Sequence, residues 1–380
     1  MSTSKCRHLF PRAARGGYLD TAAEGLPAPG VGEALTAYFL EKEKGTPGRK
    51  RHFEKESEAR ELAAQLLDTP VNNIAFAPSA SDALNTLALS LDLRPGDEVI
   101  TTELEFPSNV LPWLALRARG IKVHVLPCPA GYIDLQDIAA RFSNRTRLVS
   151  ISLVSYKSGA RFLETRELAE LVHEAGGALC VDATQAFGRC PVPLDGVDYL
   201  MSSSFKWLMA PHGLAVVYMS PAFRERFEPL GVGWYSVENV FWPDRFERYT
   251  LKRGAPCIAA GMPNFASLYA ICESLRFLLG LDRAAERARL DRLSIELRAR
   301  LVALDVEMLT PADPALVSGI VAFSHDDATQ IGPALEQEGI TVWAGDNRVR
   351  ASLHCYNDES DVDLLAGALD RVLKQVVHAG

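Results

Sequence analysis

Several side chains that can do chemistry lie close together between residues 178 and 220. Lys206 lies in the sequence SSSFKW, directly after an apolar run that is typical of a buried strand. Lysine side chains usually lie on solvated surfaces, whereas the end of a buried strand often borders a ligand site. Asp182 ends another apolar run, ALCVDA. Taken singly, a surface lysine and a turn aspartate would explain these residues, but together they indicate a shared site.

A lysine and a buried acid on neighbouring strands suit the chemistry of pyridoxal phosphate (PLP). The lysine holds this cofactor as a Schiff base and moves protons at the α-carbon of the substrate. The acid keeps the pyridine nitrogen protonated, so that the ring accepts electrons. We therefore assign these catalytic tasks to Lys206 and Asp182, and we expect burial beside a protonated ring to lower the pKa of Lys206.

A phosphate cradle is predicted at the start of a helix. Ser79, Ala80 and Ser81 follow the short apolar run NIAFAP and open a helical pattern. Free backbone N–H groups and the positive end of the helix dipole attract an anion there, although a plain helix cap is the alternative interpretation. Ser203, three residues before Lys206, supplies another hydroxyl group.

Three more side chains complete the predicted site. Phe106 lies at a strand end and can stack on the cofactor ring. Gln185, one turn beyond Asp182, can reach the phenolic oxygen of the ring. Arg350, in the sequence RVRAS, is the candidate for binding the substrate carboxylate, because a guanidinium group offers it two parallel hydrogen bonds.

Apolar runs alternate with helical patterns through the first two thirds of the chain. They predict an α/β fold with a mainly parallel, seven-stranded, doubly wound sheet. The candidate residues stand at the carboxyl ends of the strands, where such sheets bind ligands. The seven runs are residues 73–78, 98–102, 122–127, 147–155, 178–183, 198–203 and 214–219.

Two domains are expected from the change of pattern along the chain. Residues 17–264 read as a large PLP-binding domain that ends in a loop-rich stretch after residue 220. Residues 265–380 read as a smaller α+β domain, which we expect residues 1–16 to join in space.

Composition excludes several other classes of protein. The net charge of −8 argues against nucleic acid as a partner, and the basic run at 48–55 continues into an amphipathic helical pattern. No apolar run reaches the ~18 residues of a membrane span, and the first residues lack a signal peptide. Seven irregularly spaced cysteines without a CxxC pair indicate reduced thiols and no metal site. We therefore expect a cytoplasmic protein that acts on a small molecule.

These motifs together resemble the class V aminotransferase group of fold type I PLP enzymes. This group includes cysteine desulfurases, selenocysteine lyases and isopenicillin N epimerase-like proteins. The resemblance covers nearly the whole chain through GYLDTAAEG, ELEFPSNVLPW, VDATQAFG, SSSFKWLMAPHGLAVVY and RVRASLHCYND. It implies a homodimer with sites built from both subunits, and we expect the interface in residues 231–262, which include Arg253.

The chain departs from the usual pattern of this group around the cofactor. Phe106 and Phe205 stand where the group usually has histidines, and Tyr156 stands near an asparagine of many desulfurases. Ala255 replaces the threonine that is lent to the phosphate of the partner subunit. Phe106 in place of histidine removes a possible proton relay, and Phe205 in place of histidine removes a possible phosphate ligand.

A second departure concerns the cysteine of desulfurases. Those enzymes carry a persulfide-forming cysteine in a loop shortly before the R-x-S segment. Here the stretch ITVWAGDNRVRAS contains no cysteine. Cys355 lies beyond it in an apolar run, and we interpret it as a packed thiol.

An aminotransferase is the leading prediction for the reaction, with Lys206 moving a proton between Cα and C4′. The alternatives are a β-lyase for a sulfur- or selenium-bearing amino acid and an amino-acid epimerase. The epimerase would need a second base, for which Tyr156 and His354 are candidates. A scaffold with this fold that binds without turnover is the non-enzyme alternative, which the intact set of Lys206, Asp182 and Arg350 disfavours.

Overall fold

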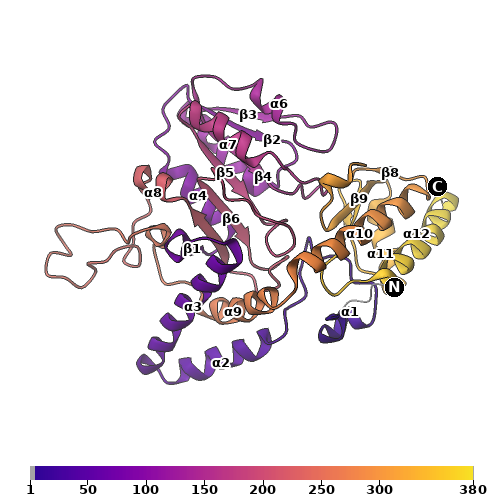
Figure 1. The fold of residues 1–380 in the computed structure, drawn as a ribbon, viewed down its shortest axis with the longest axis horizontal. Helices are drawn as coiled ribbons and strands as arrows, with labels where there is room; N and C mark the ends of the chain where they lie inside the picture. The colour runs from indigo at the N-terminus through magenta and orange to yellow at the C-terminus, as the bar shows by residue number, and fades with distance from the viewer. Residues whose placement is uncertain (1–4, 380) are drawn as a thin grey trace.

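A seven-stranded sheet forms the centre of the larger part of the molecule (Figure 1). The computed structural model describes residues 5–379. The strand order is β1-β7-β6-β5-β4-β2-β3, and β2 to β6 are parallel to one another. The predicted fold class is therefore confirmed. The strands are β1 (Ile74–Ala77), β2 (Glu98–Thr102), β3 (Lys122–Leu126), β4 (Thr146–Ser152), β5 (Ala178–Asp182), β6 (Tyr199–Ser203) and β7 (Ala215–Met219).

Strand β7 is antiparallel to both of its neighbours, β6 and β1. Residues 204–214, which connect β6 to β7, contain no helix. A parallel crossover needs a dozen or more residues, usually with a helix, so this short connection forces the chain to return in the opposite direction. The carboxyl ends of the other six strands consequently lie along one edge of the sheet, and Lys206 lies in the connection at that edge.

Helices cover both faces of this sheet, because alternate strand residues point to opposite faces. In β1, Ile74 and Phe76 belong to one core, and Ala75 and Ala77 belong to the other. Helices α3, α6, α7 and α9 contribute to the first core, whereas α4, α5 and α8 contribute to the second. Their bounds are α3 (Arg49–Leu67), α4 (Ala80–Ser90), α5 (Leu111–Ala115), α6 (Leu135–Ala139), α7 (Thr165–Glu174), α8 (Pro221–Arg226) and α9 (Phe265–Leu279).

One long helix was missed by the sequence patterns. Helix α2 (Val31–Glu43) packs on α9 beside α3, at the bottom of Figure 1. Most of its residues are exposed, so it has no strong apolar periodicity that would predict it. The basic run at 48–55 begins α3, and His52 and Lys55 from that run are buried in the packing with α9.

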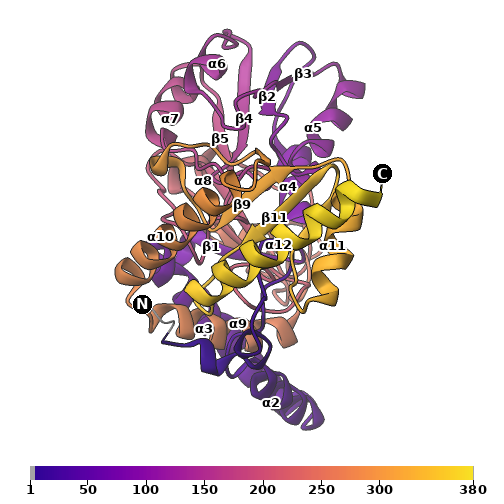
Figure 2. The same ribbon diagram turned by 90° about the vertical axis from the view of Figure 1, so that its right-hand side faces the viewer.

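A second, antiparallel sheet forms the smaller part of the molecule, with the order β10-β11-β9-β8. Figure 2 shows α12 crossing in front of the sheet, with α10 beside it on the left. These helices and α11 bury the apolar face of the sheet in a core of their own. The elements are β8 (Glu307–Met308), β9 (Ile320–Ser324), β10 (Trp343–Gly345), β11 (Arg348–Ser352), α10 (Arg283–Val302), α11 (Ala328–Gln337) and α12 (Glu359–Ala379).

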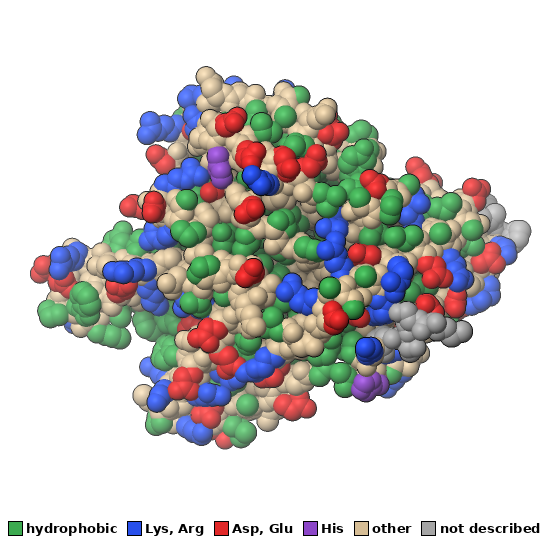
Figure 3. Space-filling model, viewed as in Figure 1, with side chains coloured by type: hydrophobic (Ala, Val, Ile, Leu, Met, Phe, Trp, Pro, Cys, Tyr) green, Lys and Arg blue, Asp and Glu red, His purple; other side chains and the backbone are tan. Residues whose placement is uncertain are grey.

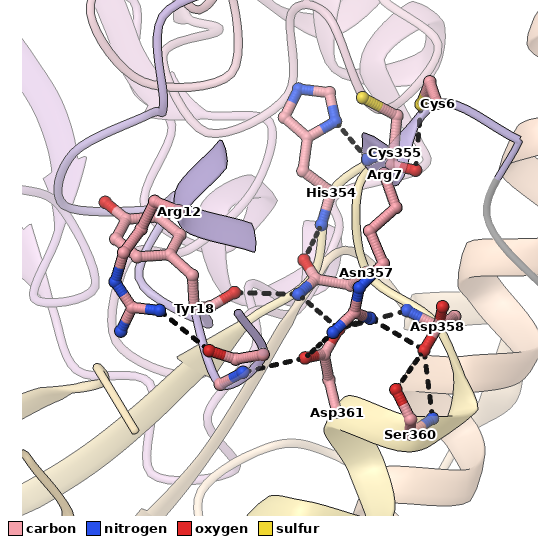
Figure 4. A network of polar contacts seen from close by, with 12 residues as sticks. Cys6, Arg7, Arg12, Tyr18, His354, Cys355, Asn357, Asp358, Ser360 and Asp361 are labelled. Carbon is pink, nitrogen blue, oxygen red and sulfur yellow. Dashed lines mark hydrogen bonds and ion pairs between the residues drawn. The ribbon is translucent and has the colours of Figure 1, made fainter. Parts of the chain in front are cut away.

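The N-terminal segment is bound to residues at the start of α12 (Figure 4). The Arg7 guanidinium group contacts Asp358 and Asp361 at 2.8 Å, and the Gly17 amide donates to Asp361 at 2.9 Å. This segment includes η1 (Arg7–Leu9) and α1 (Pro11–Ala14). The contacts support the predicted grouping of residues 1–16 with 265–380, although residues 1–4 and 380 lie outside the described residues; the division into domains stays a prediction.

An arm of residues 236–252 extends from the body on the left of Figure 1. It is a hairpin-like loop closed by the Val237–Leu251 bridge and by the hydrogen bond from Glu238 N to Thr250 O (2.8 Å). Hydrophobic side chains gather on its surface (Figure 3). Phe241 and Phe246 of the arm are 81% and 87% exposed. In the described residues, no helix combines the length and apolar character needed to cross a membrane.

Candidate active site

A cavity of about 360 Å³ lies at the carboxyl edge of the large sheet. The strand order explains how distant residues reach it, since β4, β5 and β6 are adjacent and end in Ser152, Asp182 and Ser203. All of the residues predicted to bind the cofactor or the substrate carboxylate line this one cavity. Their individual roles stay predictions. These residues are Ser79, Ala80, Ser81, Phe106, Asp182, Gln185, Ser203, Lys206 and Arg350.

Lys206 lies between aromatic rings and charged groups. Its Nζ atom is 5.4 Å from the centre of the Phe106 ring and 5.7 Å from that of Phe205. Burial, reinforced by the positive charge of Arg350, lowers the pKa of Lys206 to about 8, although Asp182 and two other acids oppose this shift. An amine with this pKa is neutral in a substantial fraction at neutral to mildly basic pH, which is the form that a nucleophile or proton acceptor requires.

The backbone of Lys206 is fixed by the loop that follows Leu19. The Gly25 amide donates to the carbonyl oxygen of Phe205 at 2.8 Å. A Cβ atom at Gly25 would lie 1.9 Å from the carbonyl oxygen of Lys206, so only glycine permits this close approach. The lysine is therefore presented from a connection that a second segment holds in place.

Asp182 is buried at the end of β5 and accepts a hydrogen bond from the Thr184 amide at 2.8 Å. Burial raises its pKa, while Thr184 and the nearby Lys206 favour the charged form. A cationic ring nitrogen beside Asp182 would favour that form further. The role of Asp182 as the partner of a pyridinium group stays a prediction.

Gln185 links the loop of Lys206 to the N-terminal loop. Its Oε1 atom accepts a hydrogen bond from Trp207 Nε1 at 2.6 Å, and its Nε2 atom donates to Ala22 O at 3.0 Å. An amide nitrogen carries two hydrogens, so one N–H group remains for the predicted contact to a phenolic oxygen. Gln185 thus holds Trp207, the residue next to Lys206, in place.

Ser79 is the N-cap of α4, as the alternative interpretation had it. Its hydroxyl oxygen accepts from Asp82 N at 3.0 Å and lies 2.5 Å from the carboxylate of Asp82. The backbone groups of Ala80 and Ser81, together with Ser203 at the end of β6, are left to form the predicted cradle. Capping and anion binding are compatible here, because a helix has four N–H groups without internal partners at its start.

Arg350 is buried on β11 and faces the cavity. It donates from Nη1 to Tyr156 O at 2.9 Å, and its guanidinium carbon is 5.3 Å from the centre of the Trp343 ring. Burial lowers its pKa to about 10, which leaves it charged at neutral pH, and its Nε atom has no hydrogen-bond partner among the described residues. A buried cation with an unused donor suits a carboxylate ligand.

Phe106 and Phe205 each pack against a second ring near Lys206. The Phe106 ring packs edge-on against Tyr156, with 5.2 Å between centres and 86° between planes. Phe205 stacks on His212 at 4.0 Å, and His212 in turn contacts Glu24 at 3.2 Å. The phenylalanines that replace the usual histidines therefore form parts of aromatic walls on either side of Lys206.

Several cavity residues were missed by the sequence patterns. Ser152 and Trp343 line the cavity, and Glu105 lies beneath it. The Glu105 carboxylate accepts from Ser152 N (2.7 Å) and from Asn109 Nδ2 (2.7 Å), and burial raises its pKa to about 7. Its place three residues after the end of β2, and one residue before Phe106, was the available signal. Ala22, Ala23, Ser108 and Thr184 also line the cavity, as do Tyr156 and Phe205, which the sequence analysis had named.

The structure places His354 outside this cavity, behind Trp207. Its Nε2 atom is 3.0 Å from Trp207 O, and its Nδ1 atom is 2.7 Å from the Cys355 amide nitrogen. Both ring nitrogens are occupied, and burial lowers the pKa of His354 to about 4. Of the two candidates for a second base, only Tyr156 borders the cavity.

No cysteine within residues 5–379 lines the cavity. All seven cysteines of the chain belong to these residues, and all are buried. The connection from β10 to β11 is a turn at Asp346 and Asn347, both with φ of 50°, and it leaves no room for a longer cysteine-bearing loop. The expectation that Cys355 is a packed thiol is confirmed, since its exposed fraction is 0%.

The fold and this cavity define a class of enzyme with a lysine at the edge of a seven-stranded sheet, and comparisons with known proteins specify the family. The aminotransferase class-V family matches residues 17–365. The chain belongs to this family and is a class-V PLP-dependent enzyme similar to cysteine desulfurases.

Individual relatives are similar over almost their whole length. A probable cysteine desulfurase of Pyrococcus abyssi is 28% identical, with 94% of each chain covered. One of Pseudomonas aeruginosa is 30% identical, again with 94% of each covered. The apo structure of a cysteine desulfurase from Thermococcus onnurineus NA1 superimposes with a TM-score of 0.89 at 25% identity, with 99% of each chain covered.

Proposed function

We propose that this protein is a PLP-dependent β-lyase that breaks the Cβ–S bond of a cysteine-like amino acid. The names of its relatives support a reaction at sulfur, and they favour this alternative over the aminotransferase that the sequence led us to expect. The observation that carries the proposal is the composition of the cavity. It combines Lys206 and Arg350, as α-proton removal requires, and the described residues that line it include no thiol to accept sulfur.

The cavity residues fit the cofactor. Asp182 would hold the ring nitrogen, the start of α4 with Ser203 would hold the phosphate, and Lys206 would hold the aldehyde carbon. When bound, PLP acts as an electron sink that makes the α-proton of an amino acid acidic.

The chain itself supplies the remaining tasks. Arg350 would bind the α-carboxylate through its unused donors, and so place Cα beside Lys206. The amino group of the substrate would take the place of Lys206 on the cofactor, and the freed Nζ atom would then take the α-proton. The sulfur group would leave Cβ as a thiolate, or as hydrosulfide when the substrate is cysteine. The walls of Phe106, Phe205 and Trp343 would limit the access of water to these charges. Hydrolysis of the remaining three-carbon unit gives pyruvate and ammonia, so cysteine and water balance against pyruvate, ammonia and hydrogen sulfide.

The role of Lys206 is tested by the change Lys206→Ala. The visible absorbance of the bound cofactor should disappear in this variant, because that absorbance depends on the bond to the lysine. Lys122→Ala, at the exposed start of β3, is the matched control and should keep the wild-type spectrum. An unchanged visible band in Lys206→Ala would refute the assignment of this lysine.

The reaction is tested by incubating the holoprotein with cysteine, cystine, selenocysteine and a set of other amino acids. Pyruvate and ammonia, together with sulfide or a persulfide in solution, are the expected products. Keto acid that forms only when an acceptor 2-oxo acid is added would show transamination and overturn the lyase proposal. Alanine with a persulfide on the protein would indicate a desulfurase, and a D-amino acid an epimerase.

We also propose that the protein acts as a homodimer. The arm of residues 236–252 exposes aromatic side chains that are costly to leave in water. A larger cavity, of about 930 Å³, lies at the base of this arm and extends to Pro78 and Asp82, beside the predicted phosphate cradle. A partner subunit docked there would lie close to the cofactor site.

A further inference from the structure

We propose that a second cavity, on the other side of the Lys206 loop, binds a small monocarboxylate. It has a volume of about 190 Å³ and shares no residue with the cavity described above. The segment 188–191 forms one side of it, the start of α10 forms another, and His354 and Cys355 lie between them. The inference does not depend on which reaction the enzyme catalyses.

Arg189 lines this cavity. Its side chain is only 1% exposed, and among the described residues it makes one ion pair, from Nη2 to Asp291 at 2.8 Å. Its Nε and Nη1 atoms are buried and have no acceptor within residues 5–379. Buried guanidinium N–H groups without acceptors are unfavourable, so this site favours a ligand that supplies negatively charged oxygen.

Arg289, on α10, shows what a fully satisfied arginine looks like in this region. It is buried too, but all three of its nitrogens have acceptors. Its Nε atom donates to Glu286 at 3.0 Å, Nη1 to Asn357 O at 2.6 Å, and Nη2 to Cys355 O at 3.1 Å. Arg189 also differs from the other arginines with unmet donors, because it leaves both Nε and Nη1 without acceptors among the described residues, whereas Arg60, Arg224, Arg348 and Arg350 each leave Nε alone.

The charge around the cavity also favours an anion. Arg283 and Arg287 line it together with Arg189. The nearby acids are already engaged, since Asp291 lies between Arg189 and Arg287 (3.5 Å to the latter) and Glu286 contacts Arg289. A positive excess consequently remains for a bound ligand.

The other walls limit what kind of anion fits. Leu66, Leu278, Leu281 and Leu290 give the cavity an apolar side. A volume of 190 Å³ corresponds to roughly six water molecules at about 30 Å³ each. A short carboxylate fills this space with its tail on the leucines and its charge on Arg189, whereas an inorganic oxyanion leaves the leucines uncovered.

The cavity is connected to the catalytic lysine through two contacts. His354 lines it and donates from Nε2 to Trp207 O at 3.0 Å, next to Lys206 (Figure 4 shows His354 beside Cys355). Gly188 also lines it, and a Cβ atom there would lie 2.4 Å from the same Trp207 oxygen. A ligand in this cavity would therefore touch the residues that hold the Lys206 loop, and its binding should alter the absorbance of the bound cofactor.

The test is a calorimetric titration of the holoenzyme with butyrate, which has a carboxylate and an apolar tail but no amino group. Because butyrate can also reach Arg350, the titration is done in an Arg350→Met background. One binding event should remain there, and adding Arg189→Met, which keeps the length of the side chain without its charge, should weaken it at least tenfold.

Three outcomes would overturn the proposal. They are the loss of all butyrate binding in Arg350→Met, equal binding with and without Arg189→Met, and binding of phosphate as tight as that of butyrate. If Arg189→Met does not fold, the exposed Arg283→Ser replaces it at the mouth of the cavity and should weaken butyrate several-fold. An unchanged affinity in Arg283→Ser would then count against the site.

Discussion

Burial and opposing charges within one cavity set the pKa of Lys206. Burial and Arg350 disfavour its protonated form, whereas Asp182, Glu24 and Asp20 favour it. The outcome is a pKa of about 8, well below the ordinary value for a lysine. The neutral amine thus begins to dominate above pH 8 in the folded apoprotein, but only above about pH 10.4 in the unfolded chain.

This difference predicts the pH dependence of chemical labelling. In apoprotein treated with an amine-selective reagent, the rate at Lys206 should rise with pH and level off just above pH 8. Solvent-exposed lysines serve as the internal control and should continue to react faster up to about pH 10. Site-by-site mass spectrometry measures both rates, and a Lys206 profile that follows the exposed lysines would contradict the assigned shift.

The same balance affects the stability of the apoprotein. A lysine whose pKa is lowered by folding binds fewer protons in the folded state than in the unfolded state. Stability therefore rises as the pH increases from about 8 towards 10.4, and Lys206 opposes folding below that range. A functional site built around a buried amine has this cost, which the surrounding acids reduce.

At the scale of elements, the N-terminal loop and the β6–β7 connection depend on each other. Gly25 is the point of closest approach, because a Cβ atom there would overlap the Lys206 carbonyl oxygen at 1.9 Å. We expect Gly25→Ala to destabilise the protein by about 1–3 kcal/mol, the usual range for overpacking. It should also disturb the cofactor spectrum, since the backbone that must move belongs to Lys206.

Gly32→Ala is the matched control for this prediction. Gly32 lies in α2, where an added Cβ atom would have no atom of the described residues within 4 Å beyond its own helix backbone and chain neighbours. Alanine is favoured over glycine within a helix by up to about 1 kcal/mol, so this change should be neutral or stabilising. Urea unfolding compares the two variants, and equal stability of Gly25→Ala and the wild type would refute the proposed contact.

Much of the site could be predicted because strand ends are readable in sequence. Asp182 and Lys206 follow apolar runs, and parallel strands bring such ends to one edge. Glu105 was missed as a support for the cavity, because its contact with Ser152 depends on β2 lying next to β4 in the sheet. That order is fixed by tertiary packing and leaves no local pattern.

Trp343 shows the same limitation in the smaller sheet. It faces the cavity because β10 pairs with β11 in a register that places Trp343 opposite Arg350. The two strands were expected from their apolar residues, but the register depends on the turn at Asp346 and Asn347. The direction of β7, by contrast, was accessible from the short connection that precedes it.

At the scale of the whole molecule, the arm of residues 236–252 is the feature that a single chain explains least. Phe241 and Phe246 are 81% and 87% exposed, and the hairpin contacts that close the arm do not cover them. Exposed apolar patches of this kind usually mark an interface. The cavity at the base of the arm, with Arg60 and Lys252 on its walls, lies next to this patch.

The double change Phe241→Ser and Phe246→Ser should therefore convert a dimer into a monomer. Both side chains lie on the surface of the arm, so the fold should be kept and circular dichroism should match the wild type. Light scattering measures the mass. Ile295→Ser, at an exposed apolar residue on α10, serves as a control and should leave the mass unchanged. A wild-type protein of single-chain mass would refute the dimer, whereas a dimer that survives the double change would place its interface away from the arm.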